Sequence, residues 1–370
     1  MRVGPASNGV TPTVRLLEPA VRLLRPASGQ WPGCSLYHRP AGSGAHLAQP
    51  GPTANQPGTL SVMSTERSKR HHVVPRMYIR RWADDNERVH VVDLAAGKDY
   101  LASIADVPVL NEFYTLESED GTKSDAFELV LAGVEGKSAS VFDAIEAGEW
   151  PLDDEHRGVM ANFVALQMAR LPSMRNVMDE SMTQINQMMA QMTLASPEAF
   201  EKTLEAVSGQ SATEADRAAL RGALGEESWE TMLTGAGFMD MMLEGIDEVL
   251  QPIYDMRWTL VTAERGEFIT SDQPVFHWRH PTWPENRPWG LFTSERTHLP
   301  INRHQIMTMK FEFDDQNKLV TRRPDDEQTM LAPGVHIVNA NAALASDRRF
   351  FVHPSALDDP DFTFPRTLEE

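Results

Sequence analysis

The chain has 370 residues, a formal net charge of −19 at pH 7, 41% hydrophobic residues and 24% charged residues, a composition typical of a globular protein. Its one cysteine, Cys34, excludes an internal disulfide and a thiolate metal cluster, so we expect a reducing compartment and a cytoplasmic protein. No uninterrupted run of about 18 apolar residues occurs, so the sequence predicts no membrane-spanning helix and a soluble protein.

The first 62 residues differ in composition from the rest. They contain five Arg, nine Pro, eight Gly and a single acidic residue, Glu18. An Arg-rich, acid-poor segment resembles an organelle transit peptide, but the density of prolines opposes the amphipathic helix that such a leader needs. We therefore expect 1–62 to be a disordered arm or a misassigned start, and 63–370 to form a single α+β domain.

Residues 63–370 carry 29 basic and 52 acidic residues, a net charge of 29 − 52 = −23. Such acidity argues against broad, sequence-independent binding to nucleic acid. Seven basic side chains nevertheless crowd between Arg67 and Arg88. Of this basic island, we assign Arg76 and Arg80 as candidate ligand-binding residues.

The first elements surround this island, in the stretch "KRHHVVPRMYIRRWAD" at 69–84. A short helix is expected from Pro75, because proline is favoured at a first helical position. Its apolar side chains Tyr78, Ile79 and Trp82 fall on one side. Two strands around a glycine turn follow in "RVHVVDLAAGKDYLAS", and "EFYTL" reads as another strand.

A helical block at about 125–256 makes up the middle of the chain. Apolar residues recur there at spacings of three, four and seven, which is the period of amphipathic helices. Two of the helices are rich in methionine, which favours core packing over an adaptable partner surface. The expected helices span about 127–145, 153–171, 175–194, 212–224 and 237–250.

After Pro252 the apolar period changes from helical to strand-like. "RWTLVTA", "EFITSD", "THLPI" and "QIMTMKFEF" are typical of strands in an antiparallel sheet, and 335–346 reads as a helix. Strands, then a block of helices, then strands again indicate an α+β fold. We expect a mixed or antiparallel sheet built from N- and C-terminal strands, with the large helical section in the middle.

Arg170 is the first candidate site residue. At 100° per residue it projects into the apolar stripe of its helix, where its permanent charge requires a carboxylate or a bound anion. Either a buried ion pair or a clamp for an anionic ligand satisfies that requirement. Asn162 and Gln167 flank the same stripe and favour a polar pocket in the core.

Ser271 and Asp272 end a predicted strand in "EFITSDQPV". A strand end can present side chains to a cleft, where Asp272 could serve as a metal ligand or general base and Ser271 could bind the ligand. Serine and aspartate before a proline also cap turns without any chemical role, and the sequence leaves both possibilities open.

His71 and His72 project to opposite sides if their segment is extended, so at most one of them points into a given pocket. Histidine suits metal binding and proton transfer near neutral pH, while an exposed pair beside basic residues is equally typical of solvated surface. Glu112, Glu128 and Glu135 could supply carboxylates, although the last two are also typical of solvated helix charges.

A loop at 276–292 gathers Phe276, Trp278, Trp283, Trp289 and Phe292. It could be a lid or a stacking platform for an aromatic ligand, or an ordered loop packed on the sheet. The His-x-x-His spacing of His277 and His280 is a weak metal signal.

Four dispersed segments, "KRHHVVPRMYIRRWAD", "NEFYTL", "ALQMARLP" and "FITSDQPV", resemble the bacterial family catalogued as domain of unknown function 4238. The resemblance covers about 66–350 and implies a shared fold, without an established activity. Gln273 departs from the family's usual asparagine, which puts a role for that amide in doubt. The family's recurring positions fall on His71 or His72, Pro75, Arg170, Ser271 and Asp272.

"HHVVPR" is also similar to the first strand of HNH endonucleases, which implies one histidine as metal ligand and the next as general base. That motif requires an asparagine about 14 residues later and a second histidine about nine residues after it. Asn86 stands close to the first position, but Ala95 occupies the second, and His90 falls on a predicted strand.

Three hypotheses follow. The first is a metal-assisted, nuclease-like hydrolase acting on a phosphodiester or other anionic substrate, either nucleic acid or a phosphorylated small molecule. It uses His72 as general base, His71 and Asp272 as ligands of a divalent metal ion, and Arg170 as anion clamp. The second is a non-catalytic module that binds a ligand or a protein, and the third treats every feature as scaffold.

Overall fold

The computed structural model describes residues 70–111, 113, 116–117, 123–124, 126–208, 212–225, 235–279, 282–284, 287, 290–316, 318–320, 324–358 and 362. The expected arm at 1–62 lies outside these residues, as do three residues noted in the sequence: Glu112, His280 and Trp289. Within the described part, the chain forms two compact units, one from 70–173 with 239–362 and the other from 174–238.

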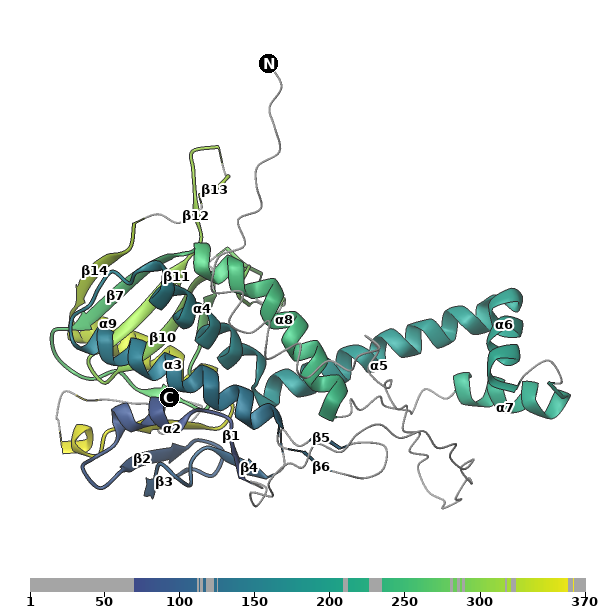
Figure 1. Cartoon of the computed structure of the whole chain (residues 1–370), viewed down its shortest axis with the longest axis horizontal. Helices are drawn as coiled ribbons and strands as arrows, with labels where there is room; N and C mark the ends of the chain where they lie inside the picture. The colour runs from purple at the N-terminus through teal and green to yellow at the C-terminus, as the bar shows by residue number, and fades with distance from the viewer. Residues whose placement is uncertain are drawn as a thin grey trace, which may run out of the picture. The chain divides into compact units, whose positions relative to one another are not determined.

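A four-stranded antiparallel sheet in the first unit pairs strands from residues 88–103 with strands from the C-terminal half. A hairpin of β2 (Arg88–Asp93) and β3 (Lys98–Ser103), both labelled in Figure 1, turns at Gly97, whose φ of +58° favours a residue without a side chain. β15 (Arg349–Val352) and β8 (Thr270–Ser271) complete the order β3-β2-β15-β8. The expected pairing of N- and C-terminal strands is therefore confirmed.

A five-stranded sheet comes entirely from the C-terminal half, in the order β14-β7-β11-β10-β9. β14 pairs with β7 in parallel and the other neighbours are antiparallel, so the sheet is mixed. The strands are β7 (Arg257–Ala263), β9 (Phe276–Arg279), β10 (Ser294–Asn302), β11 (Gln305–Lys310) and β14 (Asp326–Met330).

Short strand pairs complete the described β structure. β1 (Arg70–His72) pairs with β4 (Val109–Asn111). The other two pairs are β5 (Leu116–Glu117) with β6 (Lys123–Ser124), and β12 (Glu312–Phe313) with β13 (Leu319–Val320).

Helices lie on both faces of the five-stranded sheet. Trp258 of β7 contacts Arg157 of α4 (Asp154–Ala169), whose guanidinium carbon is 4.0 Å from the indole centroid. Val261, which points to the opposite face of the same strand, shares a core cluster with Val335 and Val338 of α9 (Ala332–Ala345).

Two longer helices accompany α4. α3 (Ala126–Glu146) runs antiparallel to α4. Phe142 contacts Phe163 with ring centroids 5.0 Å apart, and Glu135, earlier on α3, contacts Arg170, which lies later in the chain than Phe163. α8 (Gly235–Asp255) continues through Pro252, although the sequence predicted its end near 250. Burial of Ile253 and Tyr254 stabilises this last turn and offsets the hydrogen bond that Pro252 cannot donate.

A short helix anchors the basic island to the core. α2 (Arg76–Ile79) continues into the 3-10 turn η2 (Arg80–Trp82), as expected from Pro75. Tyr78 and Trp82 are fully buried. The Tyr78 hydroxyl donates to the Pro300 carbonyl (2.9 Å), and Trp82 Nε1 donates to the Phe268 carbonyl (2.8 Å). These two bonds hold α2 and η2 against the core, a few residues after the strand that carries His71 and His72.

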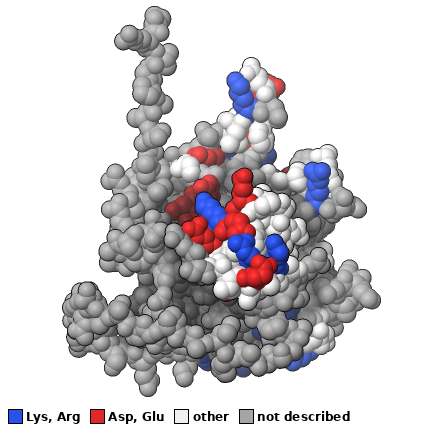
Figure 2. All heavy atoms as spheres, turned by 90° about the vertical axis from the view of Figure 1, so that its right-hand side faces the viewer, with Lys and Arg blue, Asp and Glu red and all other residues white. Residues whose placement is uncertain are grey.

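The second unit consists of helices: α5 (Pro172–Ala195, from 174 on), α6 (Pro197–Ser208) and α7 (Glu214–Gly225). Phe200 and Leu204 are buried, and Arg217 of α7 forms an ion pair with Glu201 of α6. Figure 2 looks onto α6 and α7, where acidic and basic side chains lie close together.

The length and apolar character of each helix decide whether it could span a membrane. Within the described part of the chain, no helix combines the length and the apolar character needed to cross a bilayer.

Candidate functional site

The paired histidines lie on β1 and face different surroundings. His71 is fully buried, with its Nδ1 3.8 Å from Glu128 Oε1 of α3. His72 is only half-buried, yet its Nε2 atom is buried and has no hydrogen-bond partner among the described residues. The two side chains therefore differ in burial, as expected of neighbours that project to opposite sides of a strand.

The environment of His72 favours a neutral imidazole. Burial lowers the pKa of His72 below its ordinary value, against a backbone hydrogen bond at Ala105 that raises it. The charge of Arg76 lowers this pKa further, while the carboxylate of Glu135 acts in the opposite direction. A neutral imidazole can accept a proton or coordinate a cation through the unpartnered Nε2.

Arg170 links α3, α4 and the segment that follows β1. It is fully buried at the C-terminal end of α4, as predicted. Its Nε donates to the Val73 carbonyl (2.8 Å), and its Nη1 donates to Glu135 Oε1 of α3 (2.8 Å). Of the two possibilities left open by the sequence, the buried ion pair is the one observed.

Gln167 lies one helical turn before Arg170 on α4 and is also fully buried. Neither its amide nitrogen nor its amide oxygen has a hydrogen-bond partner within the described part of the chain. Because an unsatisfied buried amide costs free energy, such a group in a native protein calls for a ligand or a bound water.

Both acidic partners of this cluster come from α3. Glu128 and Glu135 are seven residues apart, which places them on one face of the helix, and their side chains are 28% and 25% exposed. From the sequence, both residues were candidate site carboxylates, but their spacing was equally compatible with solvent-exposed charges on a helix. We call His71, His72, Glu128, Glu135, Gln167 and Arg170 the β1/α3/α4 cluster.

The arginines of the basic island lie outside this cluster and are paired with acids. Arg76 and Arg80, the expected ligand-binding residues, both contact Glu87, at 3.3 and 2.7 Å. Arg70 pairs with Asp106 at 2.7 Å. These ion pairs reduce the positive field that an anionic polymer would meet.

Asp272 is held at the turn between α9 and β15. Its two carboxylate oxygens accept hydrogen bonds from the backbone N–H groups of Asp347, Arg348 and Arg349, at 2.9 to 3.0 Å. Burial raises the pKa of Asp272 to about 6, and nearby Asp347 raises it as well. The Asp272 carboxylate therefore caps this turn through three backbone N–H groups.

The neighbours of Asp272 also make local contacts. The Ser271 hydroxyl donates to the Gln273 carbonyl (2.8 Å) and accepts from the Gln273 N–H (3.1 Å). Gln273 Nε2 donates to Ser173 Oγ, 3.1 Å away and three residues beyond Arg170. Gln273 therefore links the end of β8 to the start of α5.

The donor set for a metal ion is sparse. His71 Nδ1 and Glu128 Oε1 lie 3.8 Å apart, while the carboxylate of Asp272 is bound by backbone amides. Among the described residues, no three His, Cys, Asp or Glu side chains gather in a way that could hold a metal ion.

The described residues of the aromatic loop at 276–292 pack on other parts of the protein. His277 is hydrogen-bonded through Nδ1 to Thr297 Oγ1 (2.9 Å), and burial lowers the pKa of His277 to about 4. Trp278 packs against the core, whereas Phe292 is 63% exposed and stacks on Phe311. The His277 and His280 metal signal lies outside the described residues, because His280 is not among them.

Comparison with known proteins gives one result for this chain. Residues 70–350 match a family described as "Protein of unknown function (DUF4238)", a range that contains β1, the helices of the cluster and both sheets. Neither the curated proteins nor the solved structures contain a match. Because the match covers more than half of the sequence, the chain belongs to the DUF4238 family.

Proposed function

We propose that the chain is a hydrolase of anionic esters, with His72 as general base. The observation that carries this proposal is the buried, unpartnered Nε2 of His72 beside the ion pair of Glu135 and Arg170. A general base needs a neutral imidazole with a lone pair that no hydrogen bond occupies, and a nearby group that stabilises the imidazolium.

In the proposed reaction, His72 Nε2 takes a proton from water as the water oxygen attacks the ester carbon or phosphorus. The bond to the leaving oxygen then breaks, and that oxygen receives the proton from the imidazolium. Glu135 stabilises the transient positive charge of His72, because the two groups attract each other electrostatically. Arg170 acts as a positioning residue that holds Glu135.

The metal-assisted form of this chemistry draws on His71 and Glu128. Hard cations such as Mg²⁺ often use only one or two protein carboxylates and complete their coordination with water and substrate oxygens. The ion pairs of Arg70, Arg76 and Arg80 favour a phosphorylated small molecule over nucleic acid as substrate.

The test uses the full chain, with the ring resonances of labelled His72 observed during titration with inorganic phosphate. We expect saturable shifts of the His72 ring, and hydrolysis of a nitrophenyl phosphodiester that falls about 10²- to 10⁴-fold in His72→Gln. His304→Gln, on an exposed turn, is the matched control and should retain activity. Assays with Mg²⁺, Mn²⁺ or a chelator decide whether a cation takes part.

Phosphate that leaves the His72 ring unperturbed would refute an anionic ester as substrate. Turnover that survives in His72→Gln would remove the general base from the proposal.

The second candidate is a non-catalytic binding module, which the surface of α5 favours. Residues 181–195 of α5 contain no charged residue, and their exposed apolar side chains include Met188 (55%), Met189 (58%) and Met192 (64%). Exposed methionines suit an adaptable contact surface. Phosphate affinity that is unchanged in His72→Gln, together with no turnover of any ester, would favour this candidate.

A further inference from the structure

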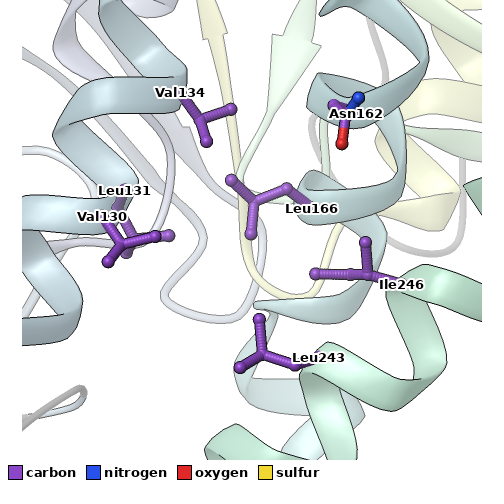
Figure 3. Close-up of a pocket in the computed structure, with 7 residues that line it drawn as sticks. All are labelled: Val130, Leu131, Val134, Asn162, Leu166, Leu243 and Ile246. Carbon is purple, nitrogen blue, oxygen red and sulfur yellow. The ribbon is translucent and has the colours of Figure 1, made fainter. Parts of the chain in front are cut away.

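The exposed surface of α5 is unusually apolar for this chain. Between α3, α4 and α8, apolar side chains close on one another and leave only about 10 Å³ of space (Figure 3), room for about one water molecule. On α5, by contrast, lie six of the fourteen large apolar side chains that are exposed among the described residues: Val177 (53%), Ile185 (45%), Met188 (55%), Met189 (58%), Met192 (64%) and Leu194 (37%). The sequence favoured core packing for these methionines, whereas the structure exposes them.

Five of these six side chains form one stripe along the helix. At 100° per residue, a sector of about 120° holds Val177, Ile185, Met188, Met189 and Met192, which we call the α5 stripe. The buried Ala190 projects from nearly the opposite side of the helix, and Leu194 projects about 100° outside the sector. The stripe is about 22 Å long, so it offers a partner a continuous apolar contact of about four turns.

The α5 stripe is uncharged, but both of its ends are acidic. Residues 181–195 contain no charged residue, and the nearest charges in the sequence are Glu180 before the stripe and Glu198 after it, both exposed. From 174 to 208, α5 and α6 carry two basic and five acidic residues, a net charge of 2 − 5 = −3. The complementary surface is therefore an apolar strip with positive charges at both ends.

This charge pattern selects among classes of partner. A second copy of the chain would bring the same acidic ends and a net charge of −19 against the stripe, which is repulsive. Anionic lipid headgroups and the phosphates of nucleic acid meet the same repulsion. A basic amphipathic helix supplies both the apolar strip and the positive ends, and two helices pack side by side through the ridges and grooves of their side chains.

We propose that the α5 stripe is the docking surface for a basic amphipathic helix of a partner protein, with lysine or arginine at both ends of its apolar strip. The flexible methionine side chains adapt to the apolar side chains of the partner, and Glu180 and Glu198 pair with its basic ends. The inference goes beyond the proposed hydrolase, because no residue of the stripe belongs to the β1/α3/α4 cluster.

Two synthetic peptides test this surface on the full chain, with the methionine methyl groups isotope-labelled. Both peptides form a helix of about 18 residues with one leucine stripe; one carries lysine at both ends and the other carries glutamate there. We expect saturable binding of the lysine peptide, with shifts of the methyl groups of Met188, Met189 and Met192. It should bind at least about tenfold more tightly than the glutamate peptide, and added salt should weaken it several-fold.

Met188→Gln combined with Met192→Gln makes the middle of the stripe polar at two exposed positions. The lysine peptide should bind this variant about tenfold or more weakly, because the burial of two methionine side chains is lost. Leu194→Gln is the matched control, since it changes an exposed apolar residue of the same helix outside the stripe. This control should bind the peptide like the wild type, and circular dichroism compares the helix content of both variants.

Glu180→Gln combined with Glu198→Gln tests the charged ends. Each neutralised charge should weaken binding of the lysine peptide by about 1.5- to fivefold and reduce the preference over the glutamate peptide. Glu264→Gln, at an exposed position in the first unit, is the control and should leave both affinities unchanged.

Several results would overturn the proposal. No binding of the lysine peptide, or equal affinity for the two peptides, would exclude a basic helix as partner. Equal losses in Leu194→Gln and in the double methionine variant would exclude the stripe. A dimer of the chain alone in sedimentation velocity that the double methionine variant converts to monomer would assign the surface to a second copy.

The peptide assay is independent of the proposed hydrolase. His72→Gln should bind the lysine peptide like the wild type, because the general base lies outside the stripe. Peptide binding without ester hydrolysis would reject the hydrolase and retain the docking surface, and hydrolysis without peptide binding would do the reverse.

Discussion

Gln167 is a buried residue whose amide costs the folded protein stability. Its amide is fully buried, and within the described residues neither polar atom has a partner. We expect Gln167→Met, which keeps the shape and removes the amide, to raise the free energy of unfolding by about 1–3 kcal/mol. Urea unfolding measures this change.

Gln184→Met on the exposed side of α5 is the control and should change the free energy of unfolding by less than about 0.5 kcal/mol. A loss of stability in Gln167→Met would mean that the amide has a structural partner, such as a bound water.

Asp272 gives the protein a pH-dependent stability at the residue scale. Its folded pKa of about 6 exceeds the ordinary value of 3.8, so between these values the folded state binds more protons than the unfolded state. The free energy of unfolding should therefore fall as pH rises from about 4 to 6, by about 3 kcal/mol from this group. Urea unfolding at several pH values measures the slope.

In Asp272→Asn the contribution of this group to the slope should vanish, while stability falls at every pH because an amide cannot accept all three backbone hydrogen bonds. An unchanged slope would assign the pH dependence to other groups.

At the scale of elements, one ion pair joins α3, α4 and the chain after β1. Arg170 is fully buried, whereas Glu135 is 25% exposed. Glu135→Gln strands a buried cation and should lower the free energy of unfolding by about 3–5 kcal/mol. Arg170→Met should cost less, because the remaining carboxylate reaches solvent.

The double variant Glu135→Gln with Arg170→Met completes the cycle, measured by urea unfolding. It should be more stable than Glu135→Gln alone, since no buried charge is left uncompensated. Strictly additive losses would show that the two groups do not depend on each other.

Elements with a strong local signal were predictable from the sequence. The helix after Pro75, the hairpin at Gly97 and the start of α4 at Asp153, whose side chain accepts from the His156 N–H (2.8 Å), depend on backbone chemistry within a few residues. The end of α8 was wrongly predicted, because burial of residues after Pro252 overrides the local preference of proline.

At the scale of the whole molecule, the net charge of −19 combines with a basic island whose arginines are largely neutralised. We therefore expect weak binding to duplex DNA, with a dissociation constant weaker than about 10⁻⁴ M at physiological salt. Fluorescence anisotropy with a labelled duplex measures this value. Tight binding with a steep salt dependence would instead support nucleic acid, and not a phosphorylated small molecule, as the substrate.

Glu87→Gln provides an internal comparison for that measurement, because it frees Arg76 and Arg80. DNA affinity should increase in this variant, whereas Glu149→Gln, at an exposed position shortly after α3, should leave it unchanged. Equal affinities would show that the island does not face the nucleic acid.

The sequence by itself determined the α+β class, the helical middle, membership of the family and the burial of Arg170, because periodicity and residue chemistry act over short distances along the chain. Only the tertiary structure decided which carboxylate meets Arg170, since Glu135 lies 35 residues away. It also placed Asp272 against backbone amides 75 to 77 residues later. Such partners are selected by packing between distant segments, and local spacing carries no record of that choice.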